Sequence, residues 1–399
     1  MFGVLSPLPA LLDLVIAIAT AAILLKLSGA PPSTGRFVSI DGLRGYLAFF
    51  VFMSHSSMWY FFLHGAHWTA PPSNLYTNFG QASVALFFMI TGFLFYGKIL
   101  TGRSREIDWS RLFLSRILRL YPLYLSVVLV LLVLVGIRSD WVLHESPISL
   151  AQGIIKWLGF TIAGSPDLNG VSQTSLMVAG VTWTLVYEWF FYLSLPIIAL
   201  LSFTKTPVWA LVFGLSGLVL LHLYTQLTPI IVAMFLGGIL AALLVRIDAF
   251  RHFSKTRIAS ILVASCLLFE VTQFGSSYGK VPLIFLVVAF CLIASGNNLF
   301  GVLSHPISLV LGEISYGIYL IQGLVLFVYW KYIIGFGIAS QASPFTYWLL
   351  QSLCVPLLIT VSYLAFRYIE KPAMNAVPSI HKVLLMRLKP EAGLVKEES

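Results

Sequence analysis

About eleven apolar segments follow one another along this chain, each long enough to cross a lipid bilayer as a helix. Crossing ~30 Å of hydrocarbon takes roughly 20 apolar residues in a helix. Only 10% of the 399 residues are charged, whereas soluble domains carry about 25%, so lipid must solvate most of this protein. The runs are continuous and do not alternate, which excludes a transmembrane β-barrel. The segments lie near residues 8–27, 43–63, 80–100, 117–137, 179–201, 207–224, 228–246, 258–274, 280–296, 307–330 and 344–368.

The distribution of basic residues predicts how the chain is oriented in the bilayer. With the N-terminus outside and the C-terminus inside, only 4 of the 24 Lys and Arg residues lie in outer connections, and the other 20 lie on the inner side. Such an excess is typical of the cytoplasmic side of membrane proteins. We attribute the net charge of +9 to this face and expect no nucleic-acid partner.

These patterns predict an all-α fold, a polytopic transmembrane bundle of about 11 spans with the N-terminus out and the C-terminus in. The chain divides into an N-terminal transmembrane helix with its linker (1–36), a membrane domain (37–373) and a polar cytoplasmic tail (374–399). Three cysteines lie singly in apolar segments, so we expect buried thiols without a disulfide framework. His64 and His67 are the nearest approach to a metal motif, but no carboxylate or cysteine accompanies them, so we expect no metal site.

The first group of residues with chemical potential is Asp41, Arg44 and His55. Eleven helical steps of ~100° return to within about 20° of the starting direction, so Arg44 and His55 face the same side, ~16 Å apart along the helix. Asp41 is placed to cap the start of this helix. Alone, Arg44 is explained by an interfacial anchor and His55 by a hydrogen-bonded core histidine. Together, on one face, they indicate a cavity or a partner, because ionisable groups in the bilayer are costly.

The second group is Arg116 and Arg119, followed by Tyr121. Residues three apart are neighbours on a helix, so the two guanidinium groups point the same way at the inner interface. Such a pair suits the phosphates of a ligand. Binding of lipid head groups is the alternative, and the sequence alone leaves both open.

Glu188 is the third candidate, because it lies within an apolar span and has no cation near it in sequence. A buried carboxylate is expensive unless it is paired or protonated. Trp183 and Tyr187 are four residues apart and are expected to form an aromatic wall. Tyr316 lies in a run of small and hydroxylated residues that is also typical of simple helix packing.

These residues occur in an order that resembles the membrane-bound acyltransferase-3 family over residues 38–373. The ordered set consists of Asp41-Gly42-Leu43-Arg44-Gly45 with His55, Arg116-x-x-Arg119-x-Tyr121-Pro122, Trp183-Thr184-Leu185 with Glu188, Ser315-Tyr316 with Tyr319-Leu320, and Glu370-Lys371-Pro372. The chain departs from the pattern at Gln322, where many relatives have histidine, and we assign Gln322 a structural role.

The resemblance implies a core of about ten helices and an acyl-CoA donor, usually acetyl-CoA. It implies that Arg44 and His55 take part in catalysis and that Arg116 and Arg119 are the family's twin arginines. The implied acceptor is a carbohydrate or glycolipid, such as O-antigen or exopolysaccharide. The implied location is a bacterial inner membrane, with membrane lipid as a further partner.

We therefore expect acetyl-CoA to dock at the inner face on Arg44, Arg116, Arg119 and Tyr121. His55 would act as a general base or carry the acyl group, oriented by Glu188 or Asp41. The remaining candidates are expected to contact substrate: Trp183, Tyr187 and Tyr316. A transporter or flippase of a lipid-linked sugar is the main alternative, although such proteins often have inverted repeats and none is evident in this sequence. A glycosyltransferase is the alternative enzyme class.

Overall fold

The structure is a computed structural model, and it describes residues 3–29, 31, 37–102 and 107–388. Apart from one isolated β-bridge between Leu168 and Val171, the described residues form helices, turns and loops, which confirms the all-α prediction. The predicted linker at 30–36, except for residue 31, and the end of the predicted tail at 389–399 lie outside the described residues.

Seven helical stretches of the described chain are long and apolar enough to cross a membrane. Each coincides with one of the predicted segments. They are α1 (Pro7–Ser28), α2 (Val38–Leu63), α3 (Asn74–Thr101), α4 (Trp109–Arg138), α6 (Trp183–Leu201), α13 (Ser315–Val328) continued by η3 (Tyr329–Gly335) and α14 (Phe336–Ala339), and α15 (Pro344–Ala365) continued by η4 (Phe366–Glu370), α16 (Lys371–Asn375) and α17 (Val377–Leu388).

The other predicted segments coincide with shorter apolar helices. One of these helices, α8 (Pro229–Leu244), meets the short helix α9 (Asp248–Ser254) at a bend of 106°, and the pair makes an eighth candidate span if it is counted as one. The total of eleven spans and the orientation stay predictions. The shorter helices are α5 (Pro147–Leu158), η1 (Thr174–Val178), α7 (Val208–His222), α8 (Pro229–Leu244), α9 (Asp248–Ser254), α10 (Arg257–Gln273), α11 (Lys280–Ala294), η2 (Val302–Ser304) and α12 (Pro306–Glu313).

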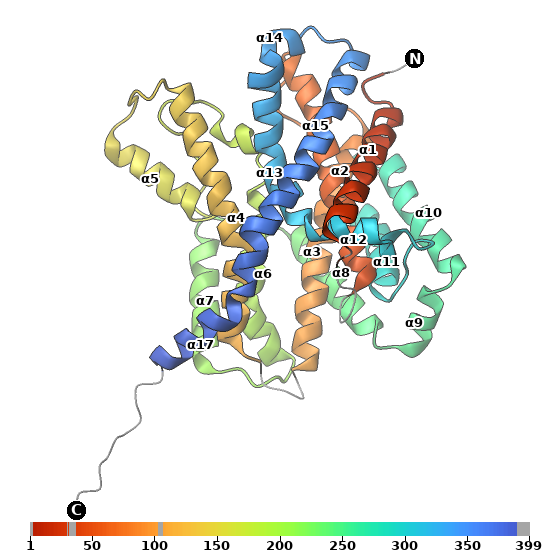
Figure 1. Ribbon diagram of the computed structural model, residues 1–399. Helices are drawn as coiled ribbons and strands as arrows, with labels where there is room; N and C mark the ends of the chain where they lie inside the picture. Colours follow the sequence, from red (N-terminus) through yellow and green to blue (C-terminus); the bar gives the residue numbers. More distant parts are fainter. Residues whose placement is uncertain (1–2, 30, 32–36, 103–106, 389–399) are drawn as a thin grey trace, which may run out of the picture.

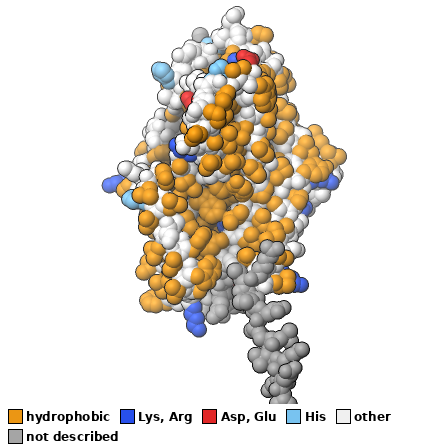
Figure 2. Space-filling view, turned by 90° about the vertical axis from the view of Figure 1, so that its left-hand side faces the viewer, with side chains coloured by type: hydrophobic (Ala, Val, Ile, Leu, Met, Phe, Trp, Pro, Cys, Tyr) orange, Lys and Arg blue, Asp and Glu red, His pale blue; other side chains and the backbone are white. Residues whose placement is uncertain are grey.

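Figure 1 shows α4, α5 and α7 on the left of the molecule and α9, α10 and α11 on the right, with α2, α13 and α15 between them. The start of α1 lies at the top of this view and α17 at the bottom. One face carries hydrophobic side chains across its middle, with most of its charged side chains toward the ends and edges (Figure 2). Many large apolar residues of the long helices are exposed, for example Leu129 and Val133 of α4 and Leu353 of α15. Such an apolar belt is what a lipid-facing surface requires.

The predicted segment 307–330 is wrong as one continuous helix, because the chain breaks at Ile314 between α12 and α13. Close packing of glycines holds α12 against the start of α2. A Cβ atom on Gly312 would lie 1.9 Å from the carbonyl oxygen of Asp41, and one on Gly42 would lie 1.9 Å from that of Leu303. Backbone therefore lies on backbone where η2 and α12 meet the first turns of α2.

The helical chain continues beyond the predicted last segment, 344–368, and past Pro372. A π-helical turn, η4, leads directly into α16, and Pro372 occupies the first turn of that helix, where its missing N–H costs nothing. Arg367 and Glu370, three residues apart, have different partners. Arg367 bonds the hydroxyl of Tyr363, while Glu370 turns inward to Arg119. The first part of the predicted polar tail is helix α17.

Candidate functional site

A cavity of about 550 Å³ lies among α2, α3, α4, α6, α13 and α16. We call it the basic cavity, because five cationic side chains and two carboxylates line it. The cationic side chains are Arg44, Lys98, Arg116, Arg119 and Lys371, and the carboxylates are Glu188 and Glu313.

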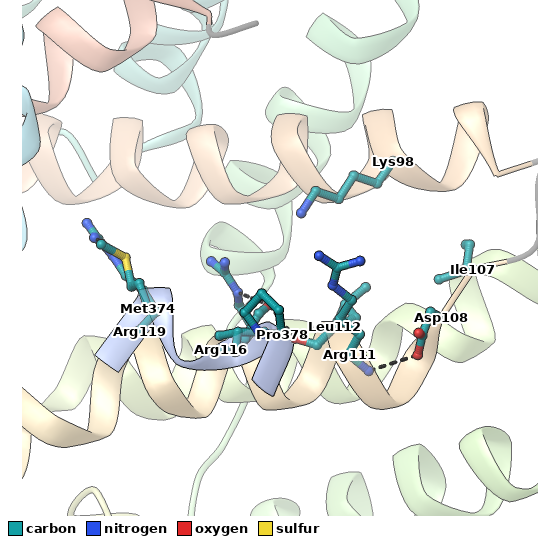
Figure 3. A pocket seen from close by; sticks show the side chains of 11 residues that line it. Lys98, Ile107, Asp108, Arg111, Leu112, Arg116, Arg119, Met374 and Pro378 are labelled. Atoms are coloured by element: carbon teal, nitrogen blue, oxygen red, sulfur yellow. Dashed lines mark hydrogen bonds between the residues drawn. The ribbon is translucent and has the colours of Figure 1, made fainter. Parts of the chain in front are cut away.

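The basic cavity continues into a neighbouring space of about 470 Å³, which we call the mouth. The two share Lys98, Arg116 and Arg119, and the exposed residues Asp108 and Arg111 connect the mouth to the surface. In Figure 3, Lys98 reaches from α3 toward the arginines of α4, while α16 and α17 cover the third side. Cations from two facing helices thus converge on one entrance, which suits a ligand with several phosphates.

The cations differ in how strongly the protein already neutralises them. Nη1 of Arg119 lies 3.6 Å from the buried carboxylate of Glu370. Arg116 and Lys98 both lie 5.1 Å from the centre of the Phe95 ring, and neither belongs to an ion pair between described residues. The ring holds these two side chains by cation–π attraction without cancelling their charge. Both are therefore available to an anionic ligand.

Arg44 and Glu188 complete the wall of the basic cavity. Arg44 lies 4.0 Å from Asp41, one turn earlier on α2. Glu188 accepts a hydrogen bond from the hydroxyl of Tyr192 on the same helix. No cation lies near Glu188 in the sequence, but in the fold several arginines of other helices line the same cavity. This explains how a carboxylate is accommodated within an apolar span.

His55 lies in a second, smaller cavity of about 150 Å³, which we call the His55 cavity. Trp183 also lines it, as does Ala70 of the exposed loop that follows α2. The indole of Trp68 lies nearly parallel to the imidazole of His55, with ring centres 6.0 Å apart.

The His55 cavity and the basic cavity share two lining residues, Val84 and Tyr319. Arg44 and His55 therefore face one side of α2, as predicted, but enter different compartments.

The partner of His55 is Gln322, and neither Glu188 nor Asp41 takes the orienting role that the sequence suggested. Nδ1 of His55 lies 3.3 Å from Oε1 of Gln322. Nε2 of Gln322 donates to the carbonyl oxygen of Tyr319 at 2.9 Å, which fixes Oε1 as the atom that faces the imidazole. An amide oxygen only accepts, so Nδ1 carries the proton. Nε2 of His55 forms no hydrogen bond within the described chain, and its lone pair is left for chemistry.

Two predicted contact residues lie away from both cavities. Tyr121 packs against Tyr124 and Phe160, because positions two apart on a helix do not share a face and Arg119 occupies the cavity side. Tyr187 bonds the carbonyl oxygen of Gln226. Asp41 lines a separate groove beside Arg246, and its contact with the basic cavity is through Arg44.

Tyr316 lines the basic cavity as predicted, and its hydroxyl donates to the carbonyl oxygen of Leu120 at 2.8 Å. Lys98 is a further cation of this site, and it was not among the candidates named from the sequence. A heptad spacing signals its position, because Val84, Thr91 and Lys98 all line the basic cavity from one face of α3. No such signal exists for Trp68, which a loop brings over His55.

Comparison with known proteins agrees with this geometry. The sequence model of one family, described as an acyltransferase domain, matches residues 37–367. The acyltransferase MdmB of Streptomyces mycarofaciens is 25% identical over 330 residues, which are 74% of this chain and 80% of that protein. No solved structure matches the chain significantly. Because the family match covers most of the sequence, including the Arg44, His55 and twin-arginine positions, the chain belongs to the membrane-bound acyltransferase-3 family.

Proposed function

We propose that this membrane acyltransferase moves an acyl group, in the first instance acetyl, from acyl-CoA to a hydroxyl of a carbohydrate or glycolipid such as O-antigen or exopolysaccharide. We place this reaction in a bacterial inner membrane. The observation that supports the proposal most strongly is the adjacency of two compartments. One is lined by cations, and the other presents a histidine with a free ring nitrogen.

The cations suit coenzyme A, which carries several phosphates and cannot enter hydrocarbon. Arg116, Arg119 and Lys98 line both the mouth and the basic cavity, so the phosphates would bind where the cavity meets the surface. The pantetheine arm is thin and long, and it would extend inward past Arg44 toward His55. Guanidinium groups bind phosphate oxygens bidentately, which fixes the donor as well as attracting it.

In the proposed step, Nε2 of His55 accepts the proton of the acceptor hydroxyl while the hydroxyl oxygen attacks the thioester carbonyl carbon. The carbon–sulfur bond then breaks, coenzyme A leaves as the thiolate, and the imidazolium returns its proton to the sulfur. In the alternative route, Nε2 attacks the thioester carbonyl carbon, the carbon–sulfur bond breaks and coenzyme A leaves as the thiolate. The acceptor hydroxyl then attacks the carbonyl carbon of the acyl-histidine, the bond from that carbon to Nε2 breaks, and the hydroxyl proton passes to the thiolate. The aromatic and polar wall of the His55 cavity, including Trp183, suits a sugar ring.

The two routes are distinguished by incubating the purified protein with acyl-labelled acyl-CoA without acceptor. A labelled adduct on His55, located by peptide mass spectrometry, would support the relay. Its absence under single-turnover conditions, together with transfer once acceptor is added, would support direct attack.

The central test replaces His55 by Ala. General base catalysis contributes roughly 10²–10⁴ in rate, so transfer should fall by at least about a hundredfold. Mass spectrometry of surface glycans, with an immunoblot of the membrane fraction, measures the loss of acetyl at constant protein level. His64→Ala is the matched control, because this exposed histidine at the end of α2 lines neither cavity. Near-normal acetylation by His55→Ala would remove the histidine from the mechanism.

The donor site is tested by Arg116→Ala and Arg119→Ala. A hydrogen bond to a charged group contributes about 1.5–3 kcal/mol, and each 1.4 kcal/mol is a tenfold change. The KM for acyl-CoA should therefore rise about tenfold or more. Arg251→Ala serves as the control, since Arg251 is exposed and pairs with Asp248 away from the mouth. An unchanged KM would return the twin arginines to lipid anchoring.

A further inference from the structure

The basic cavity and the His55 cavity are neighbouring compartments, and two side chains belong to the wall of both. Val84 comes from α3 and Tyr319 from α13, and both are buried. The arginines lie on one side of these two residues and His55 on the other. A ligand that enters among the arginines and reacts at His55 must therefore pass the wall to which Val84 and Tyr319 belong.

Tyr319 is held in this position from several sides. Its hydroxyl lies 2.9 Å from Oγ1 of Thr184 and 3.3 Å from the carbonyl oxygen of Val181. Its ring meets that of Phe87 edge to face, with centres 5.9 Å apart. Its own carbonyl oxygen accepts the hydrogen bond of Gln322, the residue that orients His55. These contacts hold the aromatic ring in place, and the hydrogen bond from Gln322 links Tyr319 to the position of His55.

The space beyond the barrier is small. The His55 cavity has about 150 Å³, against about 550 Å³ for the basic cavity. Within it, the acyl carbon and the acceptor hydroxyl must meet next to the imidazole. Little volume is left for the rest of an acyl chain, and a buried, hydrogen-bonded wall does not expand freely.

We propose that Val84 and Tyr319 form a septum between the donor side and the His55 side, and that this septum limits transfer to short acyl groups. The inference rests on the proposed function, because it assumes an acyl-CoA donor in the basic cavity. It adds the residues that select chain length, and it assigns to the Tyr319–Thr184 hydrogen bond the role of keeping the two sides apart.

The first test measures chain-length selectivity with acetyl-, butyryl- and hexanoyl-CoA. For each variant the readout is the ratio of kcat/KM for butyryl-CoA to that for acetyl-CoA, so that any loss of folded protein cancels. The native chain should favour acetyl, and Val84→Ala should raise the ratio at least tenfold. Ile90→Ala is the matched control, because Ile90 is buried on the same helix and lines only the basic cavity. Equal ratios in all three proteins would overturn length selection by the septum.

The second test detects the septum without any acyl donor. The three native cysteines are buried, so a single engineered thiol can be followed with a membrane-impermeant reagent. Thr91→Cys marks the basic cavity and Met58→Cys marks the His55 cavity. Reagent added on the arginine side should label Thr91→Cys but not Met58→Cys, whereas reagent on the opposite side should label Met58→Cys. Adding Tyr319→Ala should make Met58→Cys react from the arginine side at least tenfold faster.

The two measurements separate failure of the septum from failure of the proposed function. Equal labelling of Met58→Cys from both sides in the otherwise native chain would overturn the septum, even if the protein transfers acetyl. Failure to label it from either side would also overturn the open His55 cavity on which the septum depends. One-sided labelling in a protein that transfers no acyl group would preserve the barrier, but it would remove its assignment to acyl selection along with the proposed function.

Discussion

A neutral imidazole has one nitrogen that carries hydrogen and one that can accept it, and a neighbouring group decides which is which. In this protein, the neighbour of His55 is an amide and not a carboxylate. Gln322 presents its oxygen to Nδ1 because its nitrogen is already committed to the carbonyl oxygen of Tyr319. The arrangement orients the ring and leaves Nε2 basic, without placing a charge beside it.

Replacing Gln322 by Leu removes the acceptor and releases the ring. We expect kcat to fall about ten- to a hundredfold, as for other groups that orient a functional histidine, while the KM for acyl-CoA is unchanged. Steady-state kinetics on the purified protein measures the two constants separately. Gln322→Glu keeps an acceptor oxygen and should retain more activity than Gln322→Leu. If both variants lose donor affinity instead of kcat, Gln322 is a packing residue.

At the level of helices, the position of Arg44 depends on how closely α12 approaches α2. Gly45 and Gly312 bring these two backbones into contact, and Gly42 packs in the same way against Leu303 of η2, with no room for a Cβ atom at any of the three. Small residues permit such close helix packing in membranes. The glycines of the Asp41–Gly45 motif thus have a structural purpose, which is to hold the first turns of α2 and the arginine they carry.

Gly312→Ala places a methyl group against the backbone of Asp41, which cannot move independently of α2. Overpacking typically costs about 1–3 kcal/mol, so we expect a lower unfolding temperature in detergent and weaker donor binding. Gly97→Ala is the matched control, because a Cβ atom there meets nothing within 4 Å. Alanine at a helical site with room for a Cβ atom should be neutral or stabilising by about 0.5–1 kcal/mol. A stable Gly312→Ala protein would show that α12 and α2 can separate.

For the molecule as a whole, the mouth of the basic cavity depends on the C-terminal helix. Val377 and Pro378 of α17 line the mouth. Nε2 of His381 lies 2.8 Å from Oγ of Ser110 and 3.3 Å from the carboxylate of Asp108, at the start of α4. These contacts hold α17 across the entrance, so this helix completes the wall of the mouth.

The contact between α17 and α4 should weaken in acid. Partial burial acts to raise the pKa of Asp108, but hydrogen bonds from the backbone N–H of Arg111 and the hydroxyl of Ser110, with the nearby His381 and Arg111, hold it below its ordinary value of 3.8. A carboxyl group with a lowered pKa stabilises the folded contact above the pKa of the free side chain, and this contribution is lost as pH falls through the lowered value.

A nitroxide on Met386→Cys, at the exposed end of α17, reports this contact. Its mobility should stay constant from neutral pH to about 5 and rise only below about 4, the range in which aspartate protonates. Asp108→Ala should give the mobile spectrum at every pH. An unchanged spectrum through the whole range in which aspartate protonates would show that Asp108 does not hold α17 in place.

Much of the local structure followed from periodicity and composition. The apolar segments became helices, and helical spacing correctly placed Arg116 and Arg119 on one cavity and Arg44 and His55 on one face of α2. Helical spacing could not reveal that Tyr121 packs into an aromatic cluster, that Glu370 pairs with Arg119, or that Gln322 contacts His55. These depend on contacts between helices that are far apart in the chain.

The sequence by itself determined that the chain is helical and is embedded in the membrane. Backbone hydrogen bonding within a helix and the length of an apolar segment are local properties of the sequence. It also determined which residues carry charge and basicity. Only the tertiary structure decided that these residues occupy two compartments with Val84 and Tyr319 between them, and which partner each one meets. Cavities arise where separate helices fail to fill space, and that depends on packing over the whole bundle rather than on any one segment.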